Sequence, residues 1–420
     1  MSTKRLQVIL LVVIALLVGY FIGITKVSFE WAHYTPQITV VNKEPPSQDA
    51  LVDFSLFWAV WDKLTTNYYD KTKIDPQKML YGAITGMVES VGDPYTMFLP
   101  PTQNSDFQQQ LAGQFSGIGA QLSTKGKQII IMAPLAGSPA QAAGLKAGDA
   151  IMDVDGVSTA TWSLNDAVDK IRGPKGSTVT LTVIHEGQTN PTNIPITRNT
   201  ITVKSVAGWV KQVKNIDAIS QSLKTSSVSN DNIAYVQLSQ FGDNTTTDWT
   251  NVINSIYATV QKQQPKGLIL DLRDNPGGYL TDAVFIAGEF LPENTPVVTE
   301  DDGTQQQTLT VNRQGKLLHI PLIVLINKGS ASASEIVSGA LRDNKRAQLV
   351  GSTSFGKGTV QEALDLGNGI GLHVTIAKWL TPNGTWVNGK GLTPDVTVAL
   401  DPKDPSHDTQ LEKAIEMLTQ

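Results

Sequence analysis

The 420-residue chain is too long for one ordinary hydrophobic core, so two or three domains are expected. Its formal net charge of −5 argues against a nucleic-acid-binding protein, which would carry a basic surface. The absence of cysteine excludes disulfides, thiolate metal sites, a cysteine nucleophile and a lipidated N-terminal cysteine.

The N-terminal segment, residues 1–27, has the pattern of a signal anchor. Lys4 and Arg5 precede an apolar run from about Leu6 to Ile24, which is close to the ~20 residues that span a bilayer. This run is longer than the core of a cleaved signal and no A-x-A site follows it, so a retained transmembrane helix is favoured over a cleaved signal. The basic residues place the N-terminus in the cytoplasm and the bulk of the chain on the extracytoplasmic side of the cell membrane, periplasmic or extracellular.

Two segments then lead to the first compact module. Residues 28–49 are polar and contain prolines, which predicts a tether. Residues 50–110 show helical apolar spacing up to Gly92-Asp93-Pro94, which predicts an N-terminal helical region of two or three helices. So few short helices are expected to pack on a neighbour or on a second copy of the chain.

Residues 111–190 predict a β-rich module whose elements resemble, in order and wording, a PDZ domain of the circularly permuted kind found in bacterial proteases. Its elements are a strand at Ile129–Met132, a capped helix at Ser138–Gly144, a strand before the Asp155-Gly156 turn, a helix at Leu164–Ile171 and a strand at Thr178–Ile184.

The stretch Phe115-Ser-Gly-Ile-Gly-Ala120 resembles the carboxylate-binding loop of such a domain. The backbone N–H groups of Gly117, Ile118 and Gly119 would capture a C-terminal carboxylate while the peptide adds to the sheet as a strand. The alternative is that these glycines serve a tight turn only.

Residues 191–400 predict an α/β layered domain, because a strand–turn–helix rhythm begins at Ile233. Residues 204–232 are polar and weakly patterned, and the sequence does not place them. A helical tail is expected over residues 401–420, at Gln410–Leu418.

Within this domain, the stretch Leu322–Val337 runs from a buried strand through three serines on alternate positions into a helix that Ser334 is expected to cap. Small residues at such a turn leave room for a substrate backbone, and a helix N-terminus offers N–H groups to a developing negative charge. One serine is therefore a candidate nucleophile. The alternative is a Ser/Ala-rich cap without chemistry.

A serine nucleophile needs a base. His33 lies in the tether, His407 in the tail and His185 at the end of the small module, while His319 and His373 have no nearby acid motif. None of the five forms H-E-x-x-H, so a zinc protease is unsupported. Lys357 lies between Gly356 and Gly358, and burial would lower the pKa of its amine and make it a base. Gln361, one helical turn later, would orient the amine. A solvated turn lysine is the alternative.

Two other known motifs overlap this stretch, the Walker A loop of nucleotide-binding proteins and the S-x-x-K pair of penicillin-binding enzymes. Gly351-x-x-x-x-Gly356-Lys357 matches most of a Walker A loop, but Gly358 replaces the hydroxyl that should hold Mg²⁺ and no long helix follows. Ser354-x-x-Lys357 matches the S-x-x-K pair of penicillin-binding enzymes, but the adjacent glycines oppose the helix which that pair needs. Both alternatives are disfavoured.

Three motifs in fixed order make the chain similar, from about residue 50 to 400, to the carboxyl-terminal processing peptidases, or tail-specific proteases. They are Asp271-Leu-Arg-Asp-Asn-Pro-Gly-Gly278, Gly329-Ser-Ala-Ser-Ala-Ser-Glu-Ile336 and Thr353-Ser-Phe-Gly-Lys-Gly-Thr-Val-Gln361, with Gly391-Leu-Thr-Pro-Asp-Val396 as a closing motif. The resemblance implies a mixed α+β multidomain protein: a crotonase-like layered protease core with an inserted PDZ domain.

The resemblance also implies the roles of the site residues. Ser332 is the nucleophile, Lys357 the general base and Gln361 its support, while Gly277 and Ala333 supply oxyanion N–H groups, with Gly278 as an alternative to Gly277. Two further residues match positions that the family resemblance suggests. They are Arg172, which would contact the core or lie in a solvated turn, and Asp343, which is expected to be structural.

We therefore expect a membrane-anchored serine endopeptidase that recognises protein C-termini through its PDZ domain and cleaves with a Ser–Lys dyad. No metal or organic cofactor is implied, the partners are protein substrates with free C-termini and the membrane, and a homodimer is expected by resemblance. The rival hypotheses are a catalytically silent PDZ scaffold and a crotonase-like enzyme acting on small acyl substrates.

Overall fold

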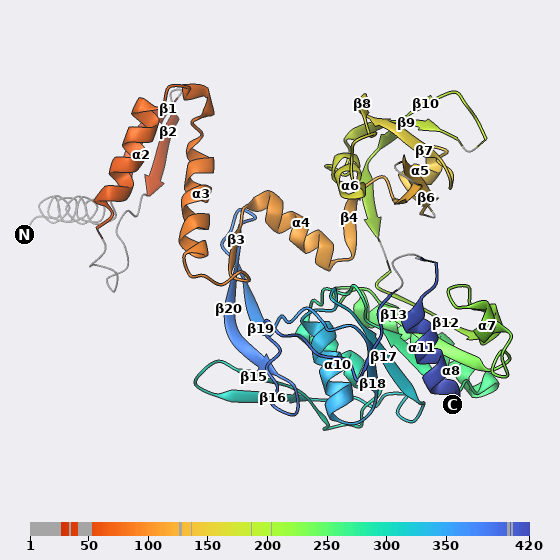
Figure 1. Ribbon diagram of the computed structural model, residues 1–420. Helices are drawn as coiled ribbons and strands as arrows, with labels where there is room; N and C mark the ends of the chain where they lie inside the picture. The colour runs from red at the N-terminus through yellow and green to blue at the C-terminus, as the bar shows by residue number, and fades with distance from the viewer. Residues whose placement is uncertain are drawn as a thin grey trace, which may run out of the picture. The chain divides into compact units, whose positions relative to one another are not determined.

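The computed structural model describes residues 27–32, 35–40, 53–125, 128–135, 137–185, 187–202, 204–400, 404 and 406–420. The chain divides into two compact units, residues 1–80 and 81–420 (Figure 1). Helix α3 (Pro76–Glu89) contains the boundary between them. Each unit is described by itself below.

The first unit contains an antiparallel hairpin, β1 (Val27–Ala32) and β2 (Thr35–Val40), which begins at the last residue of the predicted anchor segment and otherwise lies in the predicted tether. It continues with α2 (Ser55–Asn67), the 3-10 turn η2 (Lys71–Lys73) and the start of α3, in agreement with the predicted helices. Within the described part of the chain, no helix is both long and apolar enough to cross a bilayer. The apolar run on which the anchor is predicted lies outside the described residues.

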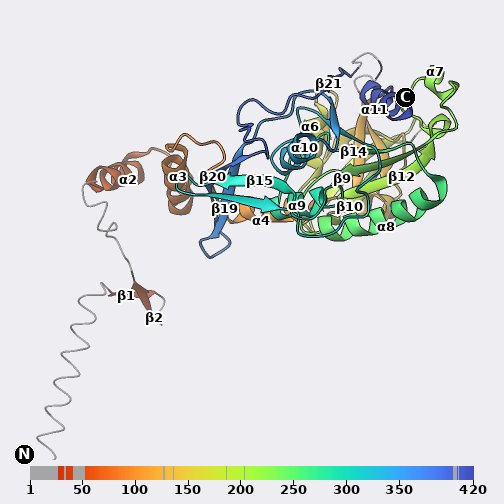
Figure 2. The ribbon, with the colours of Figure 1, turned by 90° about the horizontal axis from the view of Figure 1, so that it is seen from below.

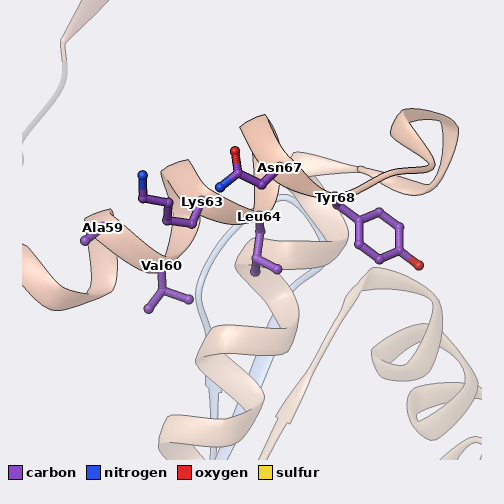
Figure 3. A pocket seen from close by; sticks show the side chains of 6 residues that line it. All are labelled: Ala59, Val60, Lys63, Leu64, Asn67 and Tyr68. Atoms are coloured by element: carbon purple, nitrogen blue, oxygen red, sulfur yellow. The ribbon is translucent and has the colours of Figure 1, made fainter.

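Helix α2 exposes most of its apolar side chains. Leu56 is 72% exposed and Val60 51%, and none of the helix residues is buried. Lys63, Leu64 and Tyr68 help to line an open hollow of about 450 Å³ along this helix (Figure 3). The unit therefore lacks a hydrophobic core of its own around α2.

The PDZ-like module is a six-stranded sheet with two short helices. Its strands are β5 (Ala120–Lys125), β6 (Gln128–Pro134), β7 (Ala150–Val154), β8 (Val157–Ser158), β9 (Thr178–Ile184) and β10 (Thr192–Thr197), and its helices are α5 (Pro139–Ala142) and α6 (Leu164–Ile171). The order is β10-β9-β7-β6-β5, with β8 beside β7. Alternate residues of β9, such as Val179 and Leu181, are fully buried, as a half-covered strand requires.

A two-stranded ribbon joins this module to the rest of the second unit. Strand β4 (Gln114–Gly117) follows α4 (Pro101–Leu111) into the module, and β11 (Asn199–Thr202) leaves it, antiparallel to β4 (Figure 1). Arg198, only 7% exposed, donates from Nε to Ile171 O at 2.7 Å and so fixes the end of α6 to the ribbon.

The main sheet of the protease-like core has the order β12-β13-β14-β17-β18-β21. Its strands are β12 (Val206–Gln212), β13 (Asn232–Leu238), β14 (Leu268–Asp271), β17 (Leu322–Ile326), β18 (Gln348–Gly351) and β21 (Val396–Thr397). β12 is antiparallel to β13 and every other pair is parallel. β12, the 3-10 turn η3 (Val213–Asn215) and α7 (Gln221–Lys224) occupy the stretch that the sequence did not place.

Helices cover both faces of this sheet. Leu268, Leu270 and Val324 pack with α8 (Thr245–Gln263), α9 (Leu280–Ala287) and α10 (Ala333–Asp343). Ile269 and Leu325 point the other way and pack with α11 (Thr409–Thr419). Figure 2 shows α8 and α11 on opposite sides of the sheet. This is a three-layer α/β core, as the strand–turn–helix rhythm predicts.

A second, five-stranded antiparallel sheet completes the core. It runs β16 (Gln306–Thr310), β15 (Pro296–Asp301), β20 (Gly371–Leu380) and β19 (Thr359–Asp365), and β3 (Met97–Leu99) pairs with β20. Met97 lies opposite His373 in this pairing. A segment that precedes the PDZ-like module is thus part of the sheet that carries the residues after Lys357.

Candidate active site

The candidate site is built from three loops that leave the same edge of the main sheet. β14, β17 and β18 are parallel neighbours, and their registers align Asp271 with Leu325 and Ile326 with Gly351. The Asn-Pro-Gly-Gly loop, the serine stretch and the Lys357 loop follow these three strand ends in turn. The carboxyl ends of parallel strands commonly carry the sites of α/β folds.

Ser332 occupies a constrained turn from β17 into α10. Its φ of 53° is positive, which is uncommon for a residue with a side chain. Helix α10 begins at Ala333, so Ser332 is its N-cap, and the prediction that Ser334 caps the helix is wrong. The sharp turn places Ser332 at the wall of a cavity of about 300 Å³.

The neighbouring serines are committed to buried hydrogen bonds. Ser330 Oγ donates to Leu272 O at 2.8 Å, and Ser334 Oγ donates to Asn275 O at 2.9 Å. Both serines are fully buried. Only Ser332 of the three lines the cavity, which makes it the best candidate nucleophile of the stretch.

Lys357 lines the same cavity from the loop between β18 and β19. Its carbonyl accepts a hydrogen bond from Trp379 Nε1 at 2.9 Å, and the carbonyl of Gly358 accepts one from Trp386 Nε1 at 2.8 Å. A Cβ on Gly358 would come within 2.9 Å of Trp386 and Asn388 atoms, so only glycine fits there. The two indoles therefore fix the backbone that carries the lysine.

The Lys357 amine is half-buried, and its charge is not paired in the described part of the chain. Nζ lies 5.0 Å from the centre of the Tyr95 ring, and no hydrogen bond joins it to Ser332 Oγ. Burial lowers the pKa of Lys357, while the negative charge of Asp93 acts in the opposite direction. A larger neutral fraction than in an exposed lysine follows, as a base requires.

Gln361 also lines the cavity, but it lies on strand β19 and not one helical turn after Lys357. Its Nε2 donates to Thr359 Oγ1 at 2.9 Å and to Thr375 Oγ1 at 3.0 Å. Pairing of β19 with β20 overrides the helical spacing. No hydrogen bond to the Lys357 amine is formed within the described residues, so the support role stays a prediction.

Glu335 connects the serine turn to the lysine loop. This fully buried carboxylate accepts the Ser332 N–H at 2.8 Å and the Lys357 N–H at 2.9 Å through Oε2. Through Oε1 it accepts the Gly356 N–H at 2.7 Å and Ser354 Oγ–H at 2.5 Å. Glu335 belongs to the Gly329–Ile336 motif, but the sequence analysis assigns it no role. It sets the positions of both candidate dyad residues at once.

The Asn-Pro-Gly-Gly loop packs against the serine turn. A Cβ on Gly277 would lie 2.8 Å from Ser332 Cβ, and one on Gly278 would lie 1.6 Å from Phe241 O, so both must be glycine. The Gly277 N–H donates to Asn275 Oδ1 at 2.9 Å. The N–H groups of Gly278 and Ala333 have no acceptor in the described structure. They are the two backbone donors available beside Ser332.

An ionic network holds the start of this loop. The Arg273 guanidinium donates from Nη2 to Asp271 Oδ2 at 2.6 Å and to Asp408 Oδ2 at 2.7 Å. Nη1 also donates to Gln410 Oε1 at 3.1 Å. Asp408 and Gln410 belong to the start of α11, so the C-terminal helix is tied to the loop that carries Gly277 and Gly278.

The cavity has further walls that the sequence analysis missed. Tyr95 comes from the turn before β3, Met97 from β3, Phe107 from α4 and His373 from β20. The ring of His373 packs edge-on against that of Phe107 at 4.5 Å. No motif marks these residues, because long-range pairing of β3 with β20 brings them to the site.

The predicted peptide-binding loop of the PDZ-like module has free donors. The N–H groups of Ile118 and Gly119 have no backbone acceptor in the described structure, while the Ile118 and Gly119 carbonyls accept from Ala140 and Leu135. Gly117 lies in β4, opposite Asn199. Gly119 has φ +72°, and a Cβ there would lie 2.5 Å from Ser138 Cβ. These N–H groups are donors of the kind that an anion-binding turn needs, and the peptide-binding role of the loop stays a prediction.

Two side predictions concern residues outside the cavity. Arg172 lies over the Phe115 ring at 5.3 Å, on the ribbon. Asp343 accepts from Arg342 Nε at 3.2 Å and from the Asn383 N–H at 3.1 Å, and so ties α10 to a loop. Over the described ranges, no cluster of three His, Asp or Glu side chains is suited to a metal ion.

Comparisons with known proteins agree with this architecture. The model of peptidase family S41 matches residues 232–398, and the PDZ domain model matches residues 106–184. Over 341 residues the chain is 35% identical to the carboxy-terminal processing protease CtpA of Bacillus subtilis (strain 168), covering 81% of this chain and 68% of that one. Over 359 residues it is 36% identical to the carboxyl-terminal-processing protease of Synechocystis sp. (strain ATCC 27184 / PCC 6803 / Kazusa), covering 84% and 79%.

Solved structures agree as well. A structure described as photosystem II D1 C-terminal processing protease matches with a TM-score of 0.50 and 30% identity, over 87% of this chain and 97% of that one. An S41 protease described as putative, from Bacteroides fragilis NCTC 9343, matches with a TM-score of 0.55 over 93% and 99%, at 16% identity, which shows the fold alone.

The fold and the sequence together define a serine-type peptidase with a PDZ domain. The chain belongs to peptidase family S41, among the carboxy-terminal processing proteases. The family resemblance seen in the three ordered motifs is thereby confirmed.

Proposed function

We propose that this peptidase hydrolyses peptide bonds with a Ser332–Lys357 dyad. The observation that carries the proposal is that the two side chains line one cavity, on loops joined by Glu335. Neutral Lys357 takes the Ser332 proton as Oγ attacks the substrate carbonyl, and gives it to the leaving amine. A water molecule, activated by the same amine, then releases the acyl group from Ser332.

The oxyanion formed in each step needs backbone donors beside Ser332. The free N–H groups of Ala333 and Gly278 support a role for this pair, and the engaged N–H of Gly277 favours Gly278 over Gly277. One such donor contributes about 10²–10³-fold to kcat in serine peptidases. Gln361 is proposed to support the amine through its Oε1 acceptor, since its Nε2 donates to Thr359 and Thr375.

The proposal also covers how the substrate reaches the cavity and where the enzyme is located. The PDZ domain would hold the C-terminus of a protein substrate at Gly117, Ile118 and Gly119 and supply the chain to the cavity. Residues 1–27 would anchor the enzyme with its bulk outside the cytoplasm. The exposed apolar residues of α2 are compatible with self-association of the N-terminal region.

The dyad is tested by trapping the acyl-enzyme. Full-length protein is incubated with a slowly hydrolysed acyl ester, and the modified peptide is located by mass spectrometry. We expect the acyl group on Ser332 in the parent, and a strong decrease in its rate of formation in Lys357→Ala, because that variant has no base to take the serine proton. Acylation of another serine, or equal rates with and without Lys357, would contradict the dyad.

The role of the PDZ domain predicts a dependence on the substrate's C-terminal charge. An unstructured protein with a free C-terminus should be cleaved with a lower KM than the same protein ending in an amide, since the amide lacks the carboxylate that Ile118 and Gly119 would bind. Gly119→Ala should raise KM for the free acid toward that of the amide, because its Cβ would collide with Ser138. Gly137→Ala is the control, since its Cβ would meet no atom within 4 Å.

If the amide and the free acid give the same KM in the parent, capture of the C-terminus is not part of the reaction. Gly137 and Gly119 share a positive φ. An effect of backbone strain alone would therefore raise KM in both variants, and a loss of carboxylate binding only in Gly119→Ala.

A further inference from the structure

Tyr95, in the turn Asp93-Pro-Tyr-Thr96 between α3 and β3, lines the candidate catalytic cavity although it lies far from the three motifs in sequence. Tyr95 is the residue of this turn nearest to the base: Lys357 Nζ lies over its ring at 5.0 Å. This is within the range at which an aromatic face attracts an ammonium group. A neutral amine gains no such attraction.

Hydrogen bonds fix the turn, so Tyr95 is held in place. Asp93 Oδ1 accepts the Tyr95 N–H at 3.1 Å, and Asp93 Oδ2 accepts Thr96 Oγ1–H at 2.7 Å. The Thr375 N–H of β20 donates to Thr96 Oγ1 at 3.0 Å. The same Thr375 accepts Gln361 Nε2 at 3.0 Å. The turn is therefore part of one network with the second sheet.

The charges around the amine favour a cation on the Tyr95 ring. Asp93 attracts it, and the buried Glu335 carboxylate is already engaged by four donors. Burial, and then the charge of Lys357, lowers the pKa of His373, so His373 is neutral while Lys357 is charged. Burial, and then the charges of Glu335 and Asp93, raises the pKa of Tyr95, so its hydroxyl stays protonated.

We propose that Tyr95 is a positioning residue that holds the protonated Lys357 amine on its ring face, away from Ser332, and releases the amine toward Ser332 once it loses its proton. The proton passes to water, and the neutral amine turns to accept the hydrogen of Ser332 Oγ. The idea rests on the proposed role of Lys357 as the base. Under this proposal, the protonation of the Lys357 amine and its position relative to Ser332 are coupled.

The first test measures the amine directly, without activity. In full-length protein carrying Ser332→Ala, the rate of Lys357 acylation by acetic anhydride is followed against pH by mass spectrometry. Tyr95→Leu should move the midpoint about 0.5–1 pH unit lower, because the charged amine loses the aromatic face. Tyr95→Phe keeps that face and should leave the midpoint in place. Tyr69→Leu is the matched control, since Tyr69 is 86% exposed and outside the cavity.

An unchanged midpoint in Tyr95→Leu, or an equal shift in Tyr95→Phe, would overturn the proposal. If Tyr95→Leu does not fold, Tyr95→Met is measured in its place, since it is also apolar and lacks a ring.

The second test separates this proposal from the proposed function. With Ser332 present, the acid limb of kcat/KM should shift to lower pH in Tyr95→Leu by as much as the acylation midpoint does, raising activity several-fold below that limb. A shift in the acylation midpoint with an unmoved acid limb would support the contact of Tyr95 with the amine and overturn Lys357 as the base.

Discussion

Ser332→Ala in the full-length chain is expected to lower kcat for cleavage of an unstructured protein by ~10⁴-fold or more, and Lys357→Ala by a comparable factor. In the proposed mechanism the two groups act as a unit: without Oγ no acyl-enzyme forms, and without the amine the serine proton has no acceptor. The double variant should therefore be no worse than the single ones. KM should change little, because neither side chain is proposed to hold the substrate before reaction. Fragments are followed by mass spectrometry.

Ser255→Ala and Lys262→Ala serve as controls, since both side chains are exposed on α8, outside the cavity. Cleavage that survives Ser332→Ala would reject this nucleophile and direct attention to Ser330, Ser334 or Ser354. If no form cleaves the substrate but all bind it, the protein under those conditions is a PDZ scaffold or a resting enzyme.

The second large effect is expected at Glu335. Glu335→Ala removes the acceptor of four hydrogen bonds and leaves the N–H groups of Ser332, Gly356 and Lys357 without it. A buried donor without an acceptor costs about 1–3 kcal/mol. We expect a clear loss in the free energy of unfolding and at least a ~10²-fold loss in kcat, since misplacement by about 1 Å has that effect. Denaturant unfolding and steady-state kinetics measure the two.

Glu335→Gln is the sharper variant, because it keeps the size and one acceptor oxygen but turns an NH₂ group toward donors. The loss in kcat, converted to a free energy, should exceed the loss in the free energy of unfolding. KM should be nearly unchanged. Asp243→Asn is a suitable comparison: it also replaces a carboxylate by an amide, but at an exposed hydrogen bond to Tyr279. A Glu335→Gln enzyme with parental kcat would show that the bridge between the two loops is not needed for the chemistry.

The elements with strong local patterns could be predicted from the sequence. Strand β17 is a run of five apolar residues buried on both faces, and it begins at the predicted residue. Helix α6 has the predicted bounds because Ser163 and Asp166 form a capping box at its start. The resemblance carried by the ordered motifs predicts that Ser332 and Lys357 share one site. Both line one cavity because their loops follow the neighbouring parallel strands β17 and β18.

The features that depend on long-range pairing could not be predicted. Gln361 has helical spacing from Lys357, yet the β19–β20 pairing makes it part of a strand. Tyr95 follows an evident helix end, and nothing local indicates that β3 joins the sheet of His373. The motif alone does not indicate that the Gly277 N–H, a predicted oxyanion donor, donates to the Asn275 side chain. Hydrogen bonds to side-chain acceptors of this kind cannot be predicted from the periodicity of a sequence.

The clamp that Arg273 forms with Asp408 has a consequence for the order of synthesis. Asp408, at the start of α11, follows every strand of the main sheet in the chain. It therefore leaves the ribosome after the serine turn and the lysine loop. Until then the base of the Asn-Pro-Gly-Gly loop lacks half of its ionic support. A nascent chain therefore completes the ionic support of its Asn-Pro-Gly-Gly loop only after the strands of the main sheet have been synthesised.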